Sequence, residues 1–250
     1  MRSWPRWANC GLDGSRWRAR SCSRLDGLRT GQYGAPYPLV RYSSLPDSPD
    51  SSRSRLLQAT IDLVRANGYA STRVEDVCAA AGVTKGSFFH HFESKEDLAI
   101  AAARQWGEGA VQLFAHAPYM SEADPVERLL GYVRFRRELI SGHIREWSCY
   151  AGTAIQETHE THPAIRDACA GSIDAHLIQV TRMVDAALAA HPVPGLTAES
   201  LALHVQAVLQ GAFVLAKARQ DARVAIDSID HLHRYVELLF SRTTRKKRPR

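Results

Sequence analysis

Apolar residues recur at helical spacing along the chain from Arg53 onward. Within Arg53–Asn67 they stand three and four residues apart, as on one face of a helix, and Gly68 follows where that helix would end. Similar spacing returns in the long segments downstream, where no run alternates apolar and polar residues as a strand does. The pattern therefore predicts an all-α fold.

Two further short helices are predicted directly after the first. Thr72 and Glu75 have the spacing of a capping box and would begin a helix that runs to Ala81. Gly82 supplies a turn, and the hydroxyl of Thr84 can cap a third helix of about two turns. Two short helices joined by a tight glycine-containing turn are typical of a helix-turn-helix.

The third helix has one apolar face and one polar face. Val83 and Phe88 can hold it against the core, while its other residues are short, polar or basic. Such a face can enter the DNA major groove, which is about 12 Å wide. The residues expected on this face are Lys85, Ser87, His90 and His91.

This segment resembles the DNA-binding domain of the tetracycline-repressor (TetR) family. The motifs that carry the resemblance are Leu56-Leu57, Gly68-Tyr69, Ala80 through Ser87, His90-His91-Phe92 and Ser94 through Leu98. The resemblance implies that DNA is contacted by Thr84, Lys85, Gly86, Ser87, Phe89, His90 and His91, with Lys95 binding a phosphate. The family usually has tyrosine where this chain has Phe89, so a hydroxyl that would bind phosphate is absent.

Six further helical segments are expected after the helix-turn-helix. They are Ser94–Phe114, a helix beginning at Asp124-Pro125, Ile144–Glu157, Ile165–His191, Thr197–Arg219 and Ile226–Phe240. The last two have broad apolar faces. The resemblance implies that they pair with the same helices of a second chain, at 197–219 and 226–240, in a four-helix bundle. The alternative is that both helices only cover the core of the monomer.

The resemblance also implies that the helical body encloses a pocket for a small-molecule effector. Pockets are mostly apolar, so the candidates are the apolar and aromatic residues of the middle helices. They are Trp106, Phe114, Phe135, Trp147, Cys149, Ile155 and Leu177. Any one of them could instead be ordinary core. Cys149 could sense electrophiles if a neighbour such as Arg145 lowered its pKa, or could be a buried, inert thiol.

The net charge of +6 does not by itself indicate DNA binding. Residues 1–52 carry eight Arg against four Asp, and residues 242–250 carry six basic groups and no acid. The segment between them therefore has a net charge of −4. Because the positive charge belongs to the two ends, the DNA-binding interpretation depends on the motif.

The composition divides the chain into four parts. Residues 1–50, rich in Arg, Ser and Pro, are expected to be disordered, either a basic arm or an unselected extension. Residues 51–97 form the DNA-binding domain, 98–241 the ligand-binding and dimerisation domain, and 242–250 a basic tail. With no apolar run of about 20 residues, no secretory signal and five scattered cysteines, a cytoplasmic protein that does not enter a membrane is expected.

No pattern predicts an enzyme. The sequence has no phosphate-binding glycine loop, nucleophile elbow or carboxylate pair above chance, and neither a cofactor nor catalytic residues are predicted. His159 and His162 are three apart rather than four, and Pro163 follows, so a loop is favoured over a metal site with Cys149. The predicted function is a ligand-responsive repressor acting as a homodimer on a palindromic operator. The alternatives are an activator of the same architecture, or a helical ligand-binding protein or enzyme with a vestigial DNA-binding head.

Overall fold

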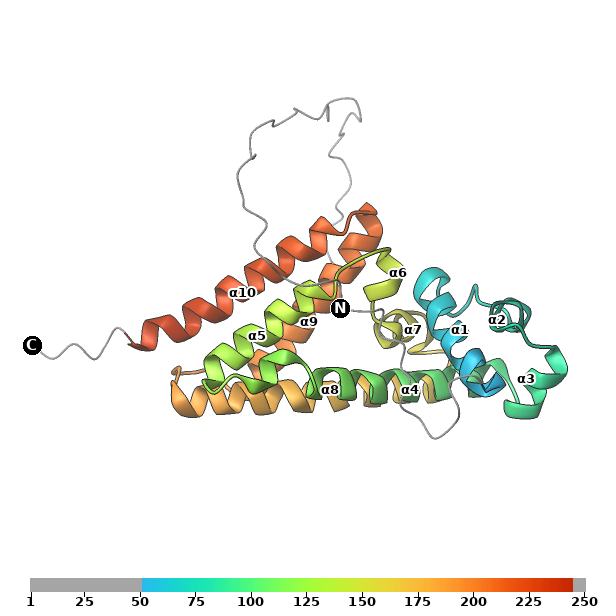
Figure 1. Cartoon of the computed structure of the whole chain (residues 1–250), viewed down its shortest axis with the longest axis horizontal. Helices are drawn as coiled ribbons and strands as arrows, with labels where there is room; N and C mark the ends of the chain where they lie inside the picture. Colours follow the sequence, from blue (N-terminus) through green and yellow to red (C-terminus); the bar gives the residue numbers. More distant parts are fainter. Residues whose placement is uncertain (1–50, 245–250) are drawn as a thin grey trace, which may run out of the picture. The chain divides into compact units, whose positions relative to one another are not determined.

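The computed structural model describes residues 51–244, with side chains as far as Ser241. The expectations for residues 1–50, and for the tail beyond Thr244, lie outside the described residues. The described part is all-α, as predicted, with ten α-helices and one 3-10 helix (Figure 1). In chain order they are α1 Ser52–Asn67, α2 Val74–Ala81, α3 Lys85–His91, α4 Lys95–Ala115, η1 Pro118–Ser121, α5 Pro125–Glu138, α6 Ile144–Trp147, α7 Tyr150–Thr158, α8 Pro163–Ala190, α9 Ala198–Arg219 and α10 Arg223–Thr244.

The turn that ends α1 requires glycine. Gly68 has a φ of +86°, a region that residues with a side chain rarely adopt. A Cβ atom at this position would also collide with the carboxylate of Glu157. That carboxylate accepts a hydrogen bond of 2.8 Å from the Ala70 backbone N–H. A side chain at position 68 would therefore displace the Glu157 carboxylate from this hydrogen bond.

The predicted cap of α2 was wrong by one residue. The helix begins after Arg73, whose backbone N–H and guanidinium both donate hydrogen bonds to Asp76. The Thr72 hydroxyl instead donates to the Gly68 carbonyl, and Glu75 forms an ion pair with Lys85. The capping box is therefore formed one position further along the chain, by Arg73 and Asp76, because the Thr72 hydroxyl already binds the preceding turn.

The helix predicted over Ile144–Glu157 is divided in two. α6 ends at Trp147, and α7 begins after Cys149, whose sulfur accepts a hydrogen bond from the Gly152 N–H. Between them the Ser148 carbonyl turns toward α1 and accepts a hydrogen bond of 2.7 Å from Arg65. A helix running through Ser148 would bind this carbonyl internally, so a tertiary hydrogen bond replaces a helical one. The short η1 helix was also not predicted.

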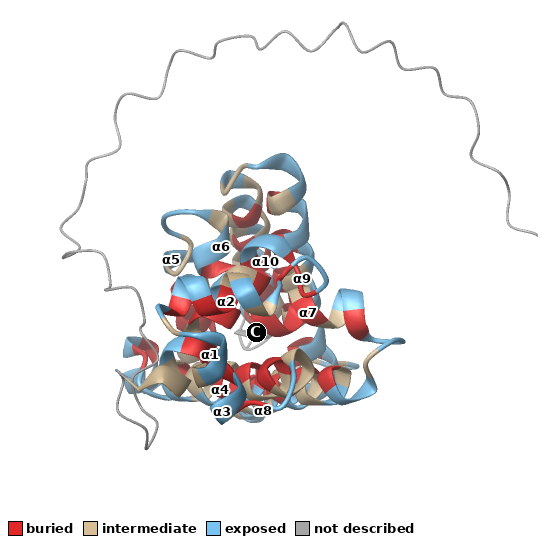
Figure 2. Cartoon of the chain, turned by 90° about the vertical axis from the view of Figure 1, so that its right-hand side faces the viewer, coloured by how far each residue is buried: buried red, intermediate tan, exposed pale blue. Residues whose placement is uncertain are grey.

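The buried residues, coloured red in Figure 2, include two hydrophobic clusters. The first joins α1, α2 and α3 to the beginning of α4, and it includes Tyr150, Ile165 and Cys169 from α7 and α8. The second joins the end of α4 and α5 to α8, α9 and α10. α4 and α8 pack along one another and take part in both clusters (Figure 1). Residues on both sides of the boundary predicted at 97/98 therefore pack in one core.

Candidate DNA-binding surface and effector site

The α3 helix is held by one buried ring and presents the rest of its surface to solvent. Phe88 is 0% exposed, whereas the adjacent Phe89 is 61% exposed. Thr84 caps the helix, since its hydroxyl accepts a hydrogen bond of 3.1 Å from the Ser87 N–H. The other predicted DNA contacts on and beside this helix are exposed or partly exposed: Thr84, Lys85, Gly86, Ser87, His90 and His91.

Two basic residues of α3 already have partners. The Lys85 ammonium lies 2.6 Å from Glu75, and this hydrogen-bonded cation holds the pKa of the carboxyl below its ordinary value. Both side chains are more than half exposed, and such surface pairs contribute little free energy. Lys85 can therefore exchange Glu75 for a DNA acceptor at small cost. His91 Nε2 lies 2.6 Å from the Ser52 hydroxyl, which ties the end of α3 to α1.

Lys95, predicted to bind a phosphate, lies at the start of α4. Its ammonium is 3.4 Å from the Ala70 carbonyl oxygen and 4.1 Å from the centre of the Tyr69 ring. Partial burial lowers the pKa of this lysine, and the nearby Glu157 opposes that shift. Ser94 caps α4, with its hydroxyl accepting a hydrogen bond from the Asp97 N–H.

The seven predicted effector-binding residues do not gather in one place. Phe114, Phe135, Trp147 and Leu177 belong to the second cluster. Trp106 and Ile155 pack against the first cluster, and the Arg65 guanidinium lies 4.9 Å from the centre of the Trp106 ring. Cys149 borders both clusters. The second cluster therefore holds four of the candidates, and they come from four different helices.

Cys149, His159 and His162 lie at the ends of α7 and α8. Burial raises the pKa of the Cys169 thiol to about 12, and the nearby Cys149 adds to this shift. His159 follows the end of α7 and His162 precedes α8, so the predicted loop is confirmed there. Among residues 51–241, no group of three His, Cys, Asp or Glu side chains is arranged to hold a metal ion.

A buried polar pair lies among the aromatic rings of the second cluster. His176 of α8 is 5% exposed, and its Nε2 lies 2.9 Å from the Tyr132 hydroxyl oxygen of α5. Burial, reinforced by the Arg136 cation, lowers the pKa of His176 to about 3. The imidazole is therefore neutral at neutral pH, and its Nδ1 has no hydrogen-bond partner among the described residues.

Acid should weaken the fold through His176. Between about pH 6.5 and pH 3 the unfolded histidine binds a proton that the folded one does not, so folding stability falls as the pH decreases. Compared with His176→Gln, the native protein is expected to lose at most about 1.4 kcal/mol of unfolding free energy per pH unit in this window. Urea unfolding followed by circular dichroism, in steps from neutral to acidic pH, measures the difference. Parallel pH dependences of the two proteins would contradict it.

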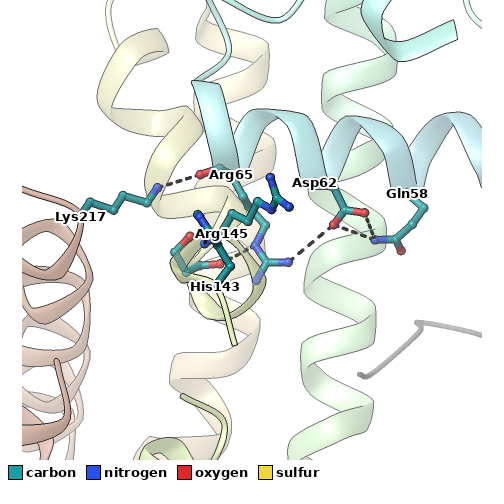
Figure 3. Close-up of polar contacts among 7 residues, drawn as sticks. Gln58, Asp62, Arg65, His143, Arg145 and Lys217 are labelled. Atoms are coloured by element: carbon teal, nitrogen blue, oxygen red, sulfur yellow. Dashed lines mark hydrogen bonds and ion pairs between the residues drawn. The ribbon is translucent and has the colours of Figure 1, made fainter. Parts of the chain in front are cut away.

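A chain of polar contacts joins α1 to α7 and α9. The Lys217 ammonium of α9 donates to the Arg65 carbonyl at 3.1 Å (Figure 3). It also donates to the Thr153 hydroxyl at 2.9 Å. The Arg65 side chain donates to the Ser148 carbonyl and lies 3.8 Å from Asp62. Burial lowers the pKa of Lys217, and the nearby Arg65 adds to this effect. Neither Lys217 nor Arg65 was predicted from the sequence, although Lys217 interrupts an otherwise apolar stretch of its helix.

The outer face of α9 and α10 carries exposed apolar side chains. On α9 these are Leu203, Val214 and Leu215, and on α10 they are Tyr235 and Leu238. The His204 and Tyr235 rings contact across the two helices with centroids 5.2 Å apart. α9 also contributes seven buried residues to the core, so it is apolar on two faces. For this reason α9 is, among the described residues, the one helix that is long and apolar enough to cross a membrane. Length and composition alone are weak evidence of a membrane span.

Comparison with known proteins gives two family matches. Residues 56–102 match the model described as bacterial regulatory proteins, tetR family. Residues 125–227 match the model described as the C-terminal domain of LmrA/YxaF-like transcriptional regulators. The first match contains the whole of α2 and α3, and the second extends from α5 into α10.

Individual proteins agree with these matches. The chain is 28% identical over 129 residues to the transcriptional regulator AcuR of Cereibacter sphaeroides, which covers 51% of this chain and 59% of AcuR. It is 33% identical over 89 residues to the repressor KstR2 of Mycolicibacterium smegmatis, covering 34% and 42% of the two chains. The chain thus spans about half the length of the curated relatives it matches.

Solved structures agree over a longer stretch. A TetR regulator from Chloroflexus aurantiacus is 27% identical, with a TM-score of 0.65, and the match covers 74% of this chain and 94% of that one. A TetR-family regulator from Agrobacterium tumefaciens shares the fold at 22% identity with a TM-score of 0.67, covering 75% and 98%. The chain belongs to the TetR family of bacterial regulatory proteins.

Proposed function

We propose that this chain is a transcriptional repressor that binds a palindromic DNA operator as a homodimer and responds to a small molecule. The observation that carries the proposal is α3, a helix fixed by buried Phe88 and exposed along the face that the family uses for DNA. Thr84, Lys85, Gly86, Ser87, Phe89, His90, His91 and Lys95 are the proposed contacts. In this proposal the protein acts in the cytoplasm and catalyses no reaction.

The proposed dimer uses the outer face of α9 and α10. Five large apolar side chains are exposed there, and contiguous apolar surface often marks a protein interface. A twofold axis through this face would present two copies of α3 to one side of a duplex. Palindromic half-sites then need the two helices about one DNA turn apart, roughly 34 Å.

The proposed response connects the body to the DNA-binding helices by two routes. One is α4, which begins beside α3 and ends in the second cluster. The other is Lys217, which joins α9 to the last turn of α1. An effector that prefers one arrangement of the body would change the placement of α1, α2 and α3 through both connections. We place residues 51–97 in the DNA-binding domain and residues 98–241 in the effector and dimer domain.

The direct test is a gel shift with the DNA upstream of the protein's own gene. A specific, competitor-resistant complex with a twofold-symmetric footprint is expected. The matched competitor is the same fragment with one half-site scrambled, which should bind much more weakly. A helical ligand-binding protein or enzyme with a vestigial head would give only salt-sensitive, sequence-independent binding. Reporter expression in the presence and absence of the protein then distinguishes repression from activation.

Two lysines should affect DNA binding in different ways. Lys95→Ala is expected to weaken binding almost uniformly across sequences and to reduce the slope of log affinity against log salt by about 1. Lys85→Ala or His90→Ala should change which base is preferred, by about 1–3 kcal/mol at one position. Fluorescence anisotropy with single-base operator variants at several salt concentrations measures both. A Lys95→Ala protein with unchanged affinity and salt slope would refute the phosphate assignment.

A further inference from the structure

The Arg136 guanidinium lies near two aromatic rings of the second cluster. Its guanidinium carbon is 5.1 Å from the centre of the Phe114 ring and 5.7 Å from that of Phe213. Both rings are buried, and Arg136 itself is only partly exposed. Its neighbours on α5, Arg134 and Arg137, each lie within ion-pair distance of a carboxylate. Within residues 51–241, Arg136 has no such carboxylate.

Unpaired polar atoms lie beside both of these rings. Trp147 packs against Phe213 with ring centroids 5.6 Å apart, and His176 packs against Phe114 at 4.3 Å. Trp147 Nε1 and His176 Nδ1 are buried without a hydrogen-bond partner among the described residues. A small rotation could pair His176 with Gln179, whose Oε1 also lacks a partner, so Trp147 is the more informative of the two.

These groups together favour one kind of ligand. An indole N–H can only donate a hydrogen bond, and a guanidinium presents five donors in a plane that matches a carboxylate. A neutral or cationic ligand would leave the half-buried Arg136 charge uncompensated, which is costly in apolar surroundings. Arg136 carries a single positive charge and its guanidinium lies within 6 Å of the centres of both rings, so a singly charged anion is the best match. The buried aromatic surroundings would accept an apolar body on that anion.

We propose that the effector is a small organic carboxylate with an apolar body, bound through its carboxylate by Arg136 and the Trp147 indole N–H. This proposal rests on the proposed function for the existence of an effector, and it specifies the effector's chemical class. Arg136 was not among the residues predicted to bind the effector, because an arginine among the charged residues of α5 has the pattern of a solvent-exposed position.

The test uses the full chain with benzoate and hexanoate as probes. Benzamide and hexanamide are the matched neutral controls, and sodium chloride at equal ionic strength controls for salt. At least one carboxylate is expected to raise the melting temperature as its concentration increases, while its amide has no effect. Arg136→Gln should weaken carboxylate binding by roughly tenfold to a hundredfold, whereas Arg134→Gln on the same helix should not change it. Arg136→Lys, which retains the charge, should bind with intermediate affinity.

A second measurement observes the NMR resonance of the Trp147 indole N–H. In a nitrogen–proton NMR spectrum, Trp147→Phe identifies the Trp147 Nε1–H resonance by its loss. Adding the carboxylate that binds should move this resonance downfield, and adding its amide should not. Melting of Arg136→Gln and Arg136→Lys without ligand shows whether each variant is folded, so that a loss of binding can be interpreted.

Three results would overturn the proposal. They are binding of neither carboxylate, equal binding of a carboxylate and its amide, and undiminished carboxylate binding by folded Arg136→Gln. If the native protein still binds the upstream DNA specifically, any of these results refutes only the proposal that the effector is a carboxylate. If the native protein does not bind that DNA specifically, the proposed regulatory function fails whichever ligands bind.

Discussion

Replacing Val214 with arginine is expected to convert the proposed dimer into a monomer. Val214 is 43% exposed and is one of the apolar side chains on the outer face of α9 and α10. In a twofold interface each substitution occurs twice, so two cations would be buried without partners. Operator affinity should fall by at least about a hundredfold, because the second half-site no longer binds in the same molecule. Analytical ultracentrifugation gives the mass, and anisotropy gives the affinity.

The matched control is Ile178→Arg. Ile178 is 52% exposed, but it lies on α8 and not on the α9 and α10 face. The same chemical change there should leave both the mass and the operator affinity close to those of the native protein. A Val214→Arg protein that remains dimeric at micromolar concentration would show that the subunits meet through another surface.

Replacing Phe88 with alanine should have the largest effect on the stability of the DNA-binding helices. Phe88 is fully buried, and its ring lies 5.0 Å from that of Phe89 and 6.0 Å from that of Phe92. Truncating a buried phenylalanine costs about 3–5 kcal/mol, out of a total stability of about 5–15 kcal/mol for a typical domain. Urea unfolding should show this loss, and specific DNA binding should disappear with it.

Phe89→Ala provides the comparison one residue away. Because its side chain is 61% exposed, truncation should change stability by no more than about 0.5 kcal/mol. If the ring contacts a sugar or a thymine methyl, operator affinity should nevertheless fall. A stability loss at Phe89 as large as that at Phe88 would contradict the assignment of one face to the core and one to DNA.

Local sequence was enough to predict α3. Thr84 caps the helix, Gly82 forms the turn, and Phe88 is the apolar residue that faces the core, so each feature acts within a few residues. The break at Ser148 could not be predicted in this way. It depends on a hydrogen bond from Arg65, 83 positions earlier in the chain. Helical spacing contains no information about such a partner.

The lack of information about distant partners also explains why the predicted effector-site residues do not lie together. Trp106, Ile155 and Phe114 were chosen as apolar or aromatic residues of the middle helices, and that criterion does not reveal the cluster each one joins. Trp106 and Ile155 pack with the first cluster, to which the beginning of α4 and the whole clustered face of α7 contribute. Arg136 and Lys217 were missed for a related reason. The burial of a charged residue depends on the neighbouring helices, which a single helix pattern does not reveal.

The contact between Lys217 and the Arg65 carbonyl has a thermodynamic consequence for assembly. α9 supplies the proposed subunit interface, and the same helix is attached through this lysine to the first DNA-binding helix. Coupling between two binding equilibria is reciprocal. If the subunit interface favours one position of α1, an operator that favours that position must tighten the association of the subunits by the same factor. The cognate duplex would then hold two chains together at dilutions where the free protein separates.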